Sequence, residues 1–362
     1  MGTDPRGVNG VCLFGGHHAG YPRSAVLLEG LRRLGVPVVK CVVSPRWKSP
    51  RRYPALLSRY ASLRDAFDVL FVPEFCHKDV PLAAALAQAG GKLCVFDPLV
   101  SRYDTRVHDR RDVARAGAQA WHNRNLDRIT MSLPDLVLAD TAAHAGYFRG
   151  LAAPGTRIGV VPVGYDDALF RAVPEPAAPP VRVLFFGSFL PLHGVDVIVE
   201  AAHLLRGRHD IEFELIGDGQ TLHDVTAKIR GYALERLRLR PRVSMDELPA
   251  RIARAHVCLG IFGSTAKASR VVPNKVFQCM GTGRVVISGD TPAMREFFVD
   301  GTDVWLVPVG DGAALAAAID RLAGDARLRS RIAEAAIANV QRNFSPLPLA
   351  SRFLAHCEAA MA

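Results

Sequence analysis

Two basic side chains, Lys275 and Arg270, lie near the predicted start of a helix in the second half of the chain. Pro273 suits the first turn of a helix, and Gly281 or Gly283 can end one. A helix N-terminus carries partial positive charge, and together with lysine and arginine it suits a diphosphate. The pattern therefore indicates an anion site, although a surface lysine at a helix start would leave the same pattern.

Glycine-rich turns follow two apolar runs in the same half of the chain. Val181–Phe186 leads into Gly187 and Ser188, and Glu212–Ile216 leads into Gly217-Asp218-Gly219. Glycine lets the backbone approach a ligand closely. A strand that feeds a helix N-terminus also presents N–H groups to a phosphate. A single G-x-G pattern is equally an ordinary turn at the end of a strand.

The first half has its own glycine-rich turn, at Gly15 and Gly16, directly before His17 and His18. The spacing G-G-H-H-A-G does not match the dinucleotide fingerprint G-x-G-x-x-G, which weighs against an NAD-dependent enzyme. The two histidines could donate hydrogen bonds to a phosphate or a sugar. They could equally be exposed loop residues.

Polar side chains also follow other predicted strands of the first half. They are Asp97, Asp104 and His108 after one strand, and His77 and Asp79 after another. Ligand sites form at the carboxyl ends of parallel strands, so these residues are candidates to contact an acceptor. Asp97 is the first candidate to touch the reacting group. A helix cap or a loop hydrogen bond is the alternative role for Asp97.

The chain is basic, with a formal net charge of +10, and the charge is uneven. Residues 1–180 hold 23 basic and 16 acidic residues, a net charge of +7, and the remainder carries +3. The segment 46–53, RWKSPRRY, mixes cations with aromatic rings. This charge favours a phosphorylated ligand or anionic lipid, or it is only a solvated surface. No recognised module supports nucleic-acid binding.

Short apolar runs alternate with helical patterns along the first half. Strands are expected at 11–14, 36–43, 69–73, 93–97, 136–139 and 157–162. Helices are expected at 23–34, 56–67, 81–89, 111–132 and 141–151. This alternation is typical of a doubly wound α/β domain with a parallel sheet.

A proline-rich segment, residues 174–180, separates this half from a second one with the same rhythm. Strands are expected there at 181–186, 212–216, 237–240, 257–261, 285–288 and 304–307, with helices between them. The sequence therefore predicts two doubly wound, Rossmann-like domains joined by a proline-rich linker, with the ligand between them.

Composition adds three expectations. The seven cysteines are an odd number without a C-x-x-C pair, and several lie in apolar runs, which favours a reducing compartment. There is no apolar run of membrane-spanning length and no signal-peptide pattern, so we expect a cytoplasmic protein. No D-x-D, H-E-x-x-H or C-x-x-C motif implies a bound metal, and no cofactor is expected.

The ordered motifs resemble those of the family 4 retaining glycosyltransferases of the GT-B fold. They are FGSFLPLHGVD, LIGDG, PNKVFQCMGTGRVVISGDTPAMREFF and DGTDVWLVPVGD in the second half, with YPRSAVLLEGLRRLG, DTAAHAGYF and VVPVGYDDALF in the first. The resemblance covers nearly the whole chain. It implies an acceptor domain at 1–173, a linker at 174–180 and a donor domain at 181–345. A C-terminal helix at 346–362 would then pack back on the first domain.

The resemblance also implies where a nucleotide sugar binds. Gly187, Ser188 and the loop to His193 would lie near the donor diphosphate, and Gly217 to Gly219 near the nucleoside. The helix that holds Asn274, Lys275 and Gln278 would cap the phosphates and the ribose. Gly15 and Gly16 would meet the donor from the first domain. His17, His77, Asp104 and His108 are candidates on the acceptor side.

This chain departs from the family pattern at three positions. Many members carry a lysine where His193 stands, and two glutamates eight residues apart where Arg270 and Gln278 stand. Gln278 can hydrogen-bond a ribose without charge, and Arg270 can pair with a phosphate but cannot accept from a hydroxyl. The phosphate clamp is therefore expected from Lys275 and Arg270.

The expected function is transfer of a sugar from a nucleotide-diphosphate sugar to a hydroxyl acceptor, with retention and without a metal ion. The expected catalytic residues are Asp97, Lys275 and Arg270. Phosphorylated and lipid-linked acceptors are both open, and so is peripheral contact with the inner face of the membrane. The alternatives are a nucleotide-sugar 2-epimerase and a catalytically degenerate subunit that only binds a nucleotide sugar.

Overall fold

The structure is a computed structural model and describes residues 7–17 and 20–362. The chain folds into two compact units. The first unit contains the described residues up to Val107, together with Asp112–Val163 and Ser345–Ala362. The second unit contains His108–Arg111 and Gly164–Phe344. Each unit is built around one parallel six-stranded sheet.

The sheet of the first unit has the order β2-β1-β3-β4-β5-β6. Its strands are β1 (Val11–Gly15), β2 (Val38–Val42), β3 (Val69–Val72), β4 (Leu93–Phe96), β5 (Leu136–Ala139) and β6 (Arg157–Val160). In the register, Val11 is opposite both Val38 and Val69. The central strands are apolar at every position because helices cover both faces of a parallel sheet.

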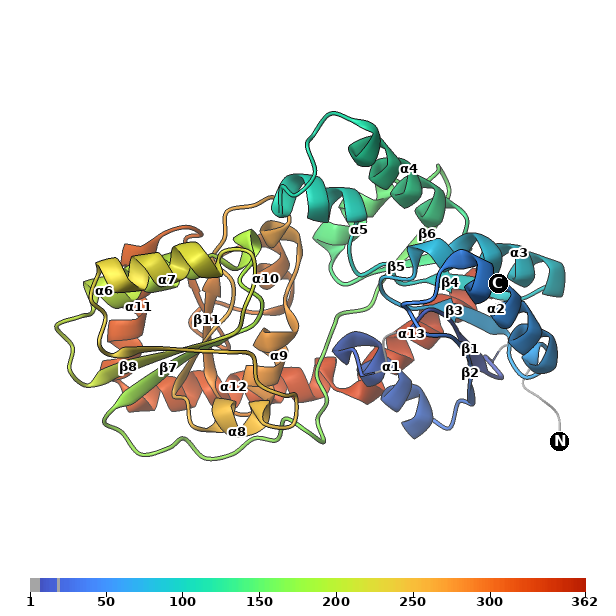
Figure 1. Ribbon diagram of the computed structural model, residues 1–362. Helices are drawn as coiled ribbons and strands as arrows, with labels where there is room; N and C mark the ends of the chain where they lie inside the picture. The colour runs from blue at the N-terminus through green and yellow to red at the C-terminus, as the bar shows by residue number, and fades with distance from the viewer. Residues whose placement is uncertain (1–6, 18–19) are drawn as a thin grey trace. The chain divides into compact units, whose positions relative to one another are not determined.

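Alternate residues of each strand enter different cores. Val11 and Leu13 pack with helices α1 (Pro22–Arg33) and α13 (Pro346–Met361), whereas Cys12 and Phe14 pack with α2 (Ser49–Leu63) and α3 (Val80–Gly90). Figure 1 shows α13 beside α1, so the end of the chain completes the core of the first unit. Helices α4 (Ala118–Ser132) and α5 (Ala142–Arg149) lie between β4 and β6 in the chain.

Two helices of the first unit begin elsewhere than expected. Helix α2 begins at Ser49 rather than at residue 56, because Pro50 lies in its first turn and Pro54 is accommodated inside it. Helix α4 begins at Ala118 rather than at residue 111, after Gly117 with φ +130°. Part of the gap before it is a π-helix, η2 (Asp104–Asp109), which no hydrophobic period predicts.

The sheet of the second unit has the order β12-β11-β10-β7-β8-β9. Its strands are β7 (Val181–Phe186), β8 (Ile211–Ile216), β9 (Leu237–Arg240), β10 (Val257–Leu259), β11 (Val285–Gly289) and β12 (Trp305–Val307). The chain first adds strands on one side of β7 and then returns to add β10 on the other. Ligands of open α/β sheets bind at such a reversal, beyond the carboxyl ends of the strands.

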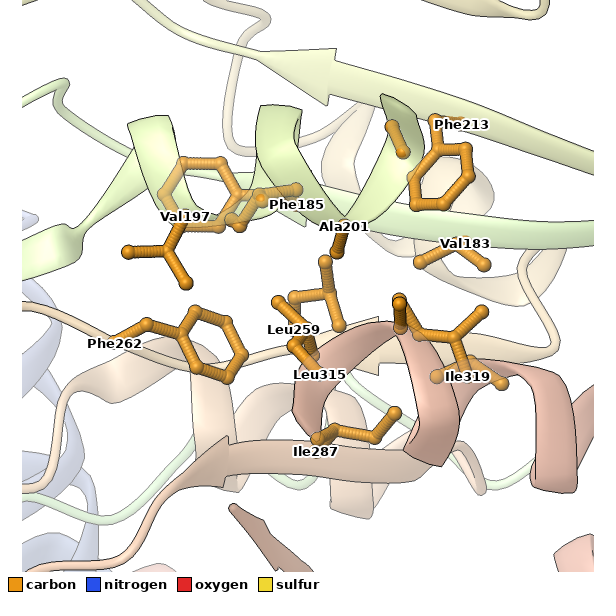
Figure 2. Packing of buried hydrophobic residues seen from close by; sticks show 14 of the residues in the cluster. Val183, Phe185, Val197, Ala201, Phe213, Leu259, Phe262, Ile287, Leu315 and Ile319 are labelled. Atoms are coloured by element: carbon orange, nitrogen blue, oxygen red, sulfur yellow. The ribbon is translucent and has the colours of Figure 1, made fainter. Parts of the chain in front are cut away.

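Helices cover both faces of this sheet. They are α6 (Val195–Leu204), α7 (Leu222–Gly231), α8 (Leu248–Ala253), α9 (Asn274–Gly281), α10 (Pro292–Phe297), α11 (Gly312–Gly324) and α12 (Ala326–Phe344). Figure 2 shows one core, where Val197 and Ala201 of α6 and Leu315 of α11 meet Phe185 and Ile287 of the strands. Helices α9 and α12 pack together and against β11.

The proline-rich segment 174–180 packs against the second unit. Arg284 donates to the Pro174 carbonyl oxygen at 2.8 Å, and Nε2 of His256 lies 3.1 Å from the Pro176 oxygen. Arg329, 2% exposed, pairs with Glu175 at 2.5 Å. Hydrogen bonds and an ion pair therefore hold the segment against the second unit.

Two further findings concern the cysteines and the apolar character of the helices. All seven cysteines lie in the described part of the chain, and each is buried with a free thiol. Among the described helices, none combines the length and the apolar character that a membrane crossing requires.

Candidate functional site

The glycine turns of the second unit lie against one another at the carboxyl ends of β7 and β8. Gly187 has φ +142° and Gly217 has φ +151°, values that L-residues with side chains rarely adopt. A Cβ atom on Gly217 would lie 1.9 Å from the Gly187 carbonyl oxygen. A Cβ atom on Gly219 would lie 2.7 Å from the Phe189 backbone. Both turns therefore need glycine, and these steric contacts explain the glycine-rich turns seen in the sequence.

Lys275 reaches the same turn from the first turn of α9. A Cβ atom on Gly187 would lie 2.9 Å from the Lys275 Nζ atom. The ammonium lies 3.7 Å from the centre of the Phe185 ring, and the residue is 5% exposed. Within the described chain its Nζ has no hydrogen-bond partner. A buried ammonium without a counter-ion is costly, and an anion bound here would remove that cost.

Burial also acts on the charge of Lys275. The desolvation of its ammonium lowers the pKa well below the usual lysine value. Phe185 contributes a cation–π contact, which stabilises the charged form only in part. An unpaired lysine at a glycine-lined strand end matches the chemistry of a phosphate-binding site.

His193 does not supply positive charge. Its Nδ1 atom meets the Ser188 carbonyl oxygen, so the neutral ring carries its proton on Nδ1. Burial, and then the nearby Lys275 ammonium, lower the pKa of His193 well below its usual value. His193 therefore orders the loop between Ser188 and Gly194, where α6 begins.

Two cations near this site were missed by the sequence analysis. Arg242 donates to the Ser188 hydroxyl at 3.1 Å and to Asp218 at 2.8 Å. Lys267 is 7% exposed and contributes to lowering the pKa of His193. Both follow strands, β9 and β10, whose carboxyl ends lie at the same edge of the sheet. That position was the available signal, but neither residue stands beside a glycine turn.

The remaining second-unit candidates lie around α9. Arg270 ends the 3-10 turn η4 (Ala268–Arg270) and is half-buried, as is Asn274, the first residue of α9. Gln278 is 4% exposed, one turn after Asn274. The structure thus places Arg270, Asn274 and Gln278 on the turn and helix that carry Lys275.

In the first unit, Asp97 is held by an arginine. It follows β4, is 1% exposed, and accepts a hydrogen bond from Arg23 Nε at 2.5 Å. Arg23 also donates to the Val161 carbonyl oxygen at 3.0 Å. Burial raises the pKa of Asp97, and Arg23 opposes that shift. Asp97 therefore forms a buried ion pair at the carboxyl end of the sheet.

Glu74, which the sequence analysis did not single out, extends this cluster. It follows β3, is 2% exposed, and accepts a hydrogen bond from Ser24 at 2.7 Å. Burial, and then the charge of Asp97, raise the pKa of Glu74 to about 7. The carboxyl group is thus only half ionised near neutral pH.

The acceptor-side candidates do not form one cluster. His77 is 1% exposed, edge-on against Phe96, and burial lowers its pKa to about 3, so it is a neutral core residue. Asp104 is 2% exposed in η2, and its backbone N–H donates to Ser101. His108 is exposed and groups with the second unit.

The glycine turn after β1 is held by a carboxylate. The Gly16 N–H donates to Asp79 Oδ2 at 2.8 Å, and a Cβ atom on Gly15 would lie 2.9 Å from the same oxygen. His17, the next residue, is half-buried, and His18 lies outside the described residues. Asp79 thus organises this turn.

The comparisons with known proteins agree with this architecture. Residues 180–325 match the family model "Glycosyl transferases group 1". Alpha-D-kanosaminyltransferase of Streptomyces kanamyceticus is 29% identical over 170 residues, 46% of this chain and 41% of that protein. The chain matches about half the length of its curated relatives, from 41% to 58%.

Solved structures extend the likeness to both units. The Anabaena protein Alr3699/HepE, crystallised with UDP and glucose, has a TM-score of 0.71 at 14% identity, covering 95% of this chain and 98% of its own. Sucrose-phosphate synthase from Thermosynechococcus elongatus has a TM-score of 0.68 at 16% identity, covering 95% and 97%. The chain therefore has the GT-B fold, with one α/β sheet in each unit, and its residues 180–325 match the model of the glycosyl transferases group 1.

Proposed function

We propose that this chain is a glycosyltransferase that moves a sugar from a nucleoside-diphosphate sugar to a hydroxyl acceptor. The observation that carries the proposal is the buried ammonium of Lys275, unpaired within the described chain and next to the Gly187 turn. The family match of residues 180–325 supports it independently. The UDP in the crystallised Anabaena protein makes UDP the first nucleotide to try.

In this proposal the second unit binds the donor. Lys275 and Arg270 pair with the diphosphate, and the backbone around Gly187 and Ser188 lies against it. Gly217 and Gly219 leave room for the nucleoside, while Asn274 and Gln278 hydrogen-bond the ribose. His193 positions the loop, and Arg242 and Lys267 add positive potential.

The transfer proceeds with retention and needs no metal ion or other cofactor. The bond between the anomeric carbon and the leaving phosphate oxygen breaks, and the acceptor oxygen bonds to that carbon from the same face. The acceptor proton passes to the leaving phosphate oxygen. Lys275 and Arg270 stabilise the charge that develops on the phosphates. No protein nucleophile is needed, so the enzyme acts by positioning and electrostatics.

Asp97 acts in this scheme as a positioning residue. Its carboxylate is bound to Arg23, so it fixes the carboxyl end of β4 rather than taking the acceptor proton. His17, His77, Asp104 and His108 remain proposed acceptor-side residues. His77 acts only through packing, because its ring is buried against Phe96.

Mass spectrometry of a nucleotide sugar incubated with the purified protein tests the proposal. A transferase slowly releases the nucleoside diphosphate and free sugar without an acceptor, and NMR of the glycoside formed with a hydroxyl acceptor reports the anomeric configuration. An isomerised nucleotide sugar would instead identify a 2-epimerase. A panel of donors left unchanged, even though they bind, would identify a subunit that only binds and would overturn the transferase assignment.

We also propose peripheral contact with an anionic membrane, through α4. Trp121, Ile129 and Leu133 are 71%, 52% and 45% exposed and lie at helical spacing on one side. Exposed Arg124 and Arg128 lie beside them. Apolar and aromatic side chains flanked by arginine suit an anionic lipid surface.

Sedimentation with vesicles of phosphatidylserine and phosphatidylcholine tests this contact. The double variant W121A/I129A should lose binding, whereas L204A, which truncates a 49%-exposed leucine of α6, should retain it. Equal sedimentation of all three proteins would contradict a role for α4.

A further inference from the structure

A cavity of about 570 Å³ opens in the first unit, within the size range of small-ligand sites. It lies at the carboxyl ends of β1 to β4. Its wall comes from Gly16 after β1, from residues 45–50 after β2 and at the start of α2, from residues 75–79 after β3, and from Arg102 after β4. The segments that follow four strands of one sheet therefore meet at the cavity.

The lining of the cavity is strongly cationic. It contains five cations, Arg46, Lys48, Arg52, Lys78 and Arg102, and a single carboxylate, Asp79, which gives a formal charge of +4. Asp79 is already engaged by Arg52, with Nη1 to Oδ1 at 3.3 Å. The side chains of Arg46, Lys48 and Lys78 are exposed and form no ion pair with any residue in the described ranges.

Arg102 brings a donor without a hydrogen-bond partner among the described residues to the wall of the cavity. Its backbone N–H donates to Asp127, but its half-buried guanidinium has a buried Nε without a hydrogen-bond partner among the described residues. A buried donor without a partner carries a desolvation cost that a bound acceptor atom would remove. After burial, the charge of the Arg102 guanidinium also lowers the pKa of His77. The His77 ring therefore stays neutral.

Arg52 is fixed before any ligand arrives. It is 7% exposed, and its Nη2 donates to the Pro45 carbonyl oxygen at 2.8 Å. A Cβ atom on Gly16 would lie 2.5 Å from that same Nη2 atom. A side chain at position 16 would therefore displace the Arg52 guanidinium, which is held without the ordering cost of a free surface arginine.

Aromatic rings lie beside the cations. Trp47 is half-buried in the lining, with the Arg51 guanidinium 4.1 Å above its ring. Phe75 is 42% exposed and has φ +64°, an uncommon backbone conformation for a bulky residue. Its ring meets Tyr21 edge-on at 5.0 Å. A strained, exposed phenylalanine in a cavity wall is typical of a binding surface.

We propose that this cavity binds the phosphate or diphosphate group of the acceptor, with Trp47 and Phe75 against its less polar part. The inference rests on the proposed transferase function and adds the chemical class of the acceptor. Several separate cations around one site favour a multiply charged phosphate over a single carboxylate. The N-terminus of α2, a helix of 15 residues that begins in the lining, adds to the positive potential.

The fluorescence emission of Trp47 can report ligand binding at the cavity. The chain has three tryptophans, so the background W121F/W305F leaves Trp47 alone. Inorganic pyrophosphate should change Trp47 emission saturably, and the affinity should fall as salt rises. The double variant K48A/K78A should weaken binding at least about tenfold, since it removes two unpaired charges. R149A, which removes an exposed arginine of α5 in the same unit, should bind as the parent does.

The probes distinguish the source of the phosphate. Pyrophosphate and glucose 1-phosphate represent soluble acceptors, and vesicles containing phosphatidic acid represent a lipid-borne group. Saturable binding that weakens in K48A/K78A supports the cavity, and the kind of probe that binds in this way assigns the source of the phosphate. Tighter binding of glucuronate than of pyrophosphate, no saturable response to any probe, or equal affinity in K48A/K78A would overturn the proposal.

Two variants distinguish a failure of this cavity proposal from a failure of the proposed transferase function. K48A/K78A should keep the thermal shift caused by nucleoside diphosphates, which bind in the second unit. K275A should lose that shift but keep the Trp47 response to pyrophosphate. Loss of both responses in either variant would show that the two sites are not distinct and would contradict this assignment.

Discussion

At the scale of single residues, the buried cation of Lys275 is the clearest functional signal. It lies against Phe185 with a depressed pKa and no hydrogen-bond partner within the described chain. Burial of such a charge without a partner is costly, and an anion bound beside it would remove that cost. The sequence could predict Lys275 because proline, lysine and a later glycine mark the start and the end of one helix.

Removing this cation should slow the reaction. We expect K275A to lower turnover at least about a hundredfold, the scale of one lost electrostatic donor. The assay is release of nucleoside diphosphate from the donor. R327A, at an exposed arginine of α12, is the matched control and should be near normal. Near-normal turnover of K275A itself would exclude Lys275 from the phosphate clamp.

Glu74 should make stability depend on pH. Its folded pKa of about 7 lies above the unfolded value of about 4.3, so the native state binds more protons between these values. Its stabilising contribution is full below about pH 4.3 and is lost as pH rises towards 7, by roughly 4 kcal/mol.

E74Q should therefore flatten the fall in stability between these pH values. The measurement is the urea midpoint from the emission of Trp47 and Trp121, both in the first unit. E235Q, at an exposed carboxylate, should follow the parent protein. Parallel curves for E74Q and the parent would mean that Glu74 titrates normally.

Other site residues could not be found from the sequence. Arg242 contacts Ser188 only because β7, β8 and β9 are neighbours in the sheet and bring distant loops together. Glu74 is notable only because Asp97 is buried near it. Asp97 follows the end of β4, and its catalytic role stays a prediction. Its partner Arg23 lies 74 positions away, and no local pattern connects them.

At the scale of elements, the glycine turns determine whether the strand ends can bind a ligand. A Cβ atom on Gly217 would collide with the Gly187 carbonyl oxygen and would also require an unfavourable φ. G217A should therefore lower stability by at least about 2 kcal/mol and remove nucleotide binding.

Thermal unfolding with and without nucleotide measures both effects of G217A. G207A is the matched control, because a Cβ atom there meets nothing within 4 Å. If G217A and G207A behaved alike, the turns would not be packed as described.

The strands were easier to predict from sequence than the helices. The central strands of the first sheet are short apolar runs, and burial on both faces explains that composition. The start of α2 was missed because Pro50 and Pro54 mimic a loop, although Pro50 lies in the first turn. The π-helix η2 has no sequence period at all.

At the scale of the whole molecule, two parallel six-stranded sheets were predictable from the repeated rhythm of the chain. The path between them was not. Residues 174–180 have the composition of a linker, yet Arg284, His256 and Arg329 attach them to the second unit. Long-range hydrogen bonds of this kind leave no trace in composition.

Each unit has its own candidate anion site. The second unit offers a nearly buried lysine beside glycine turns, and the first offers a cavity with several unpaired cations. Two separate anion sites on one chain suit a reaction between a nucleotide donor and a phosphorylated acceptor.

The most direct test of the central claim is a thermal-shift panel of UDP, GDP, ADP and TDP on the parent protein and K275A. One of these ligands at a hundred times its Kd should stabilise the parent by about 2.7 kcal/mol. The same ligand should stabilise K275A far less. If no nucleotide shifts the parent protein, or if K275A shifts equally, the second unit does not bind a nucleoside diphosphate through Lys275.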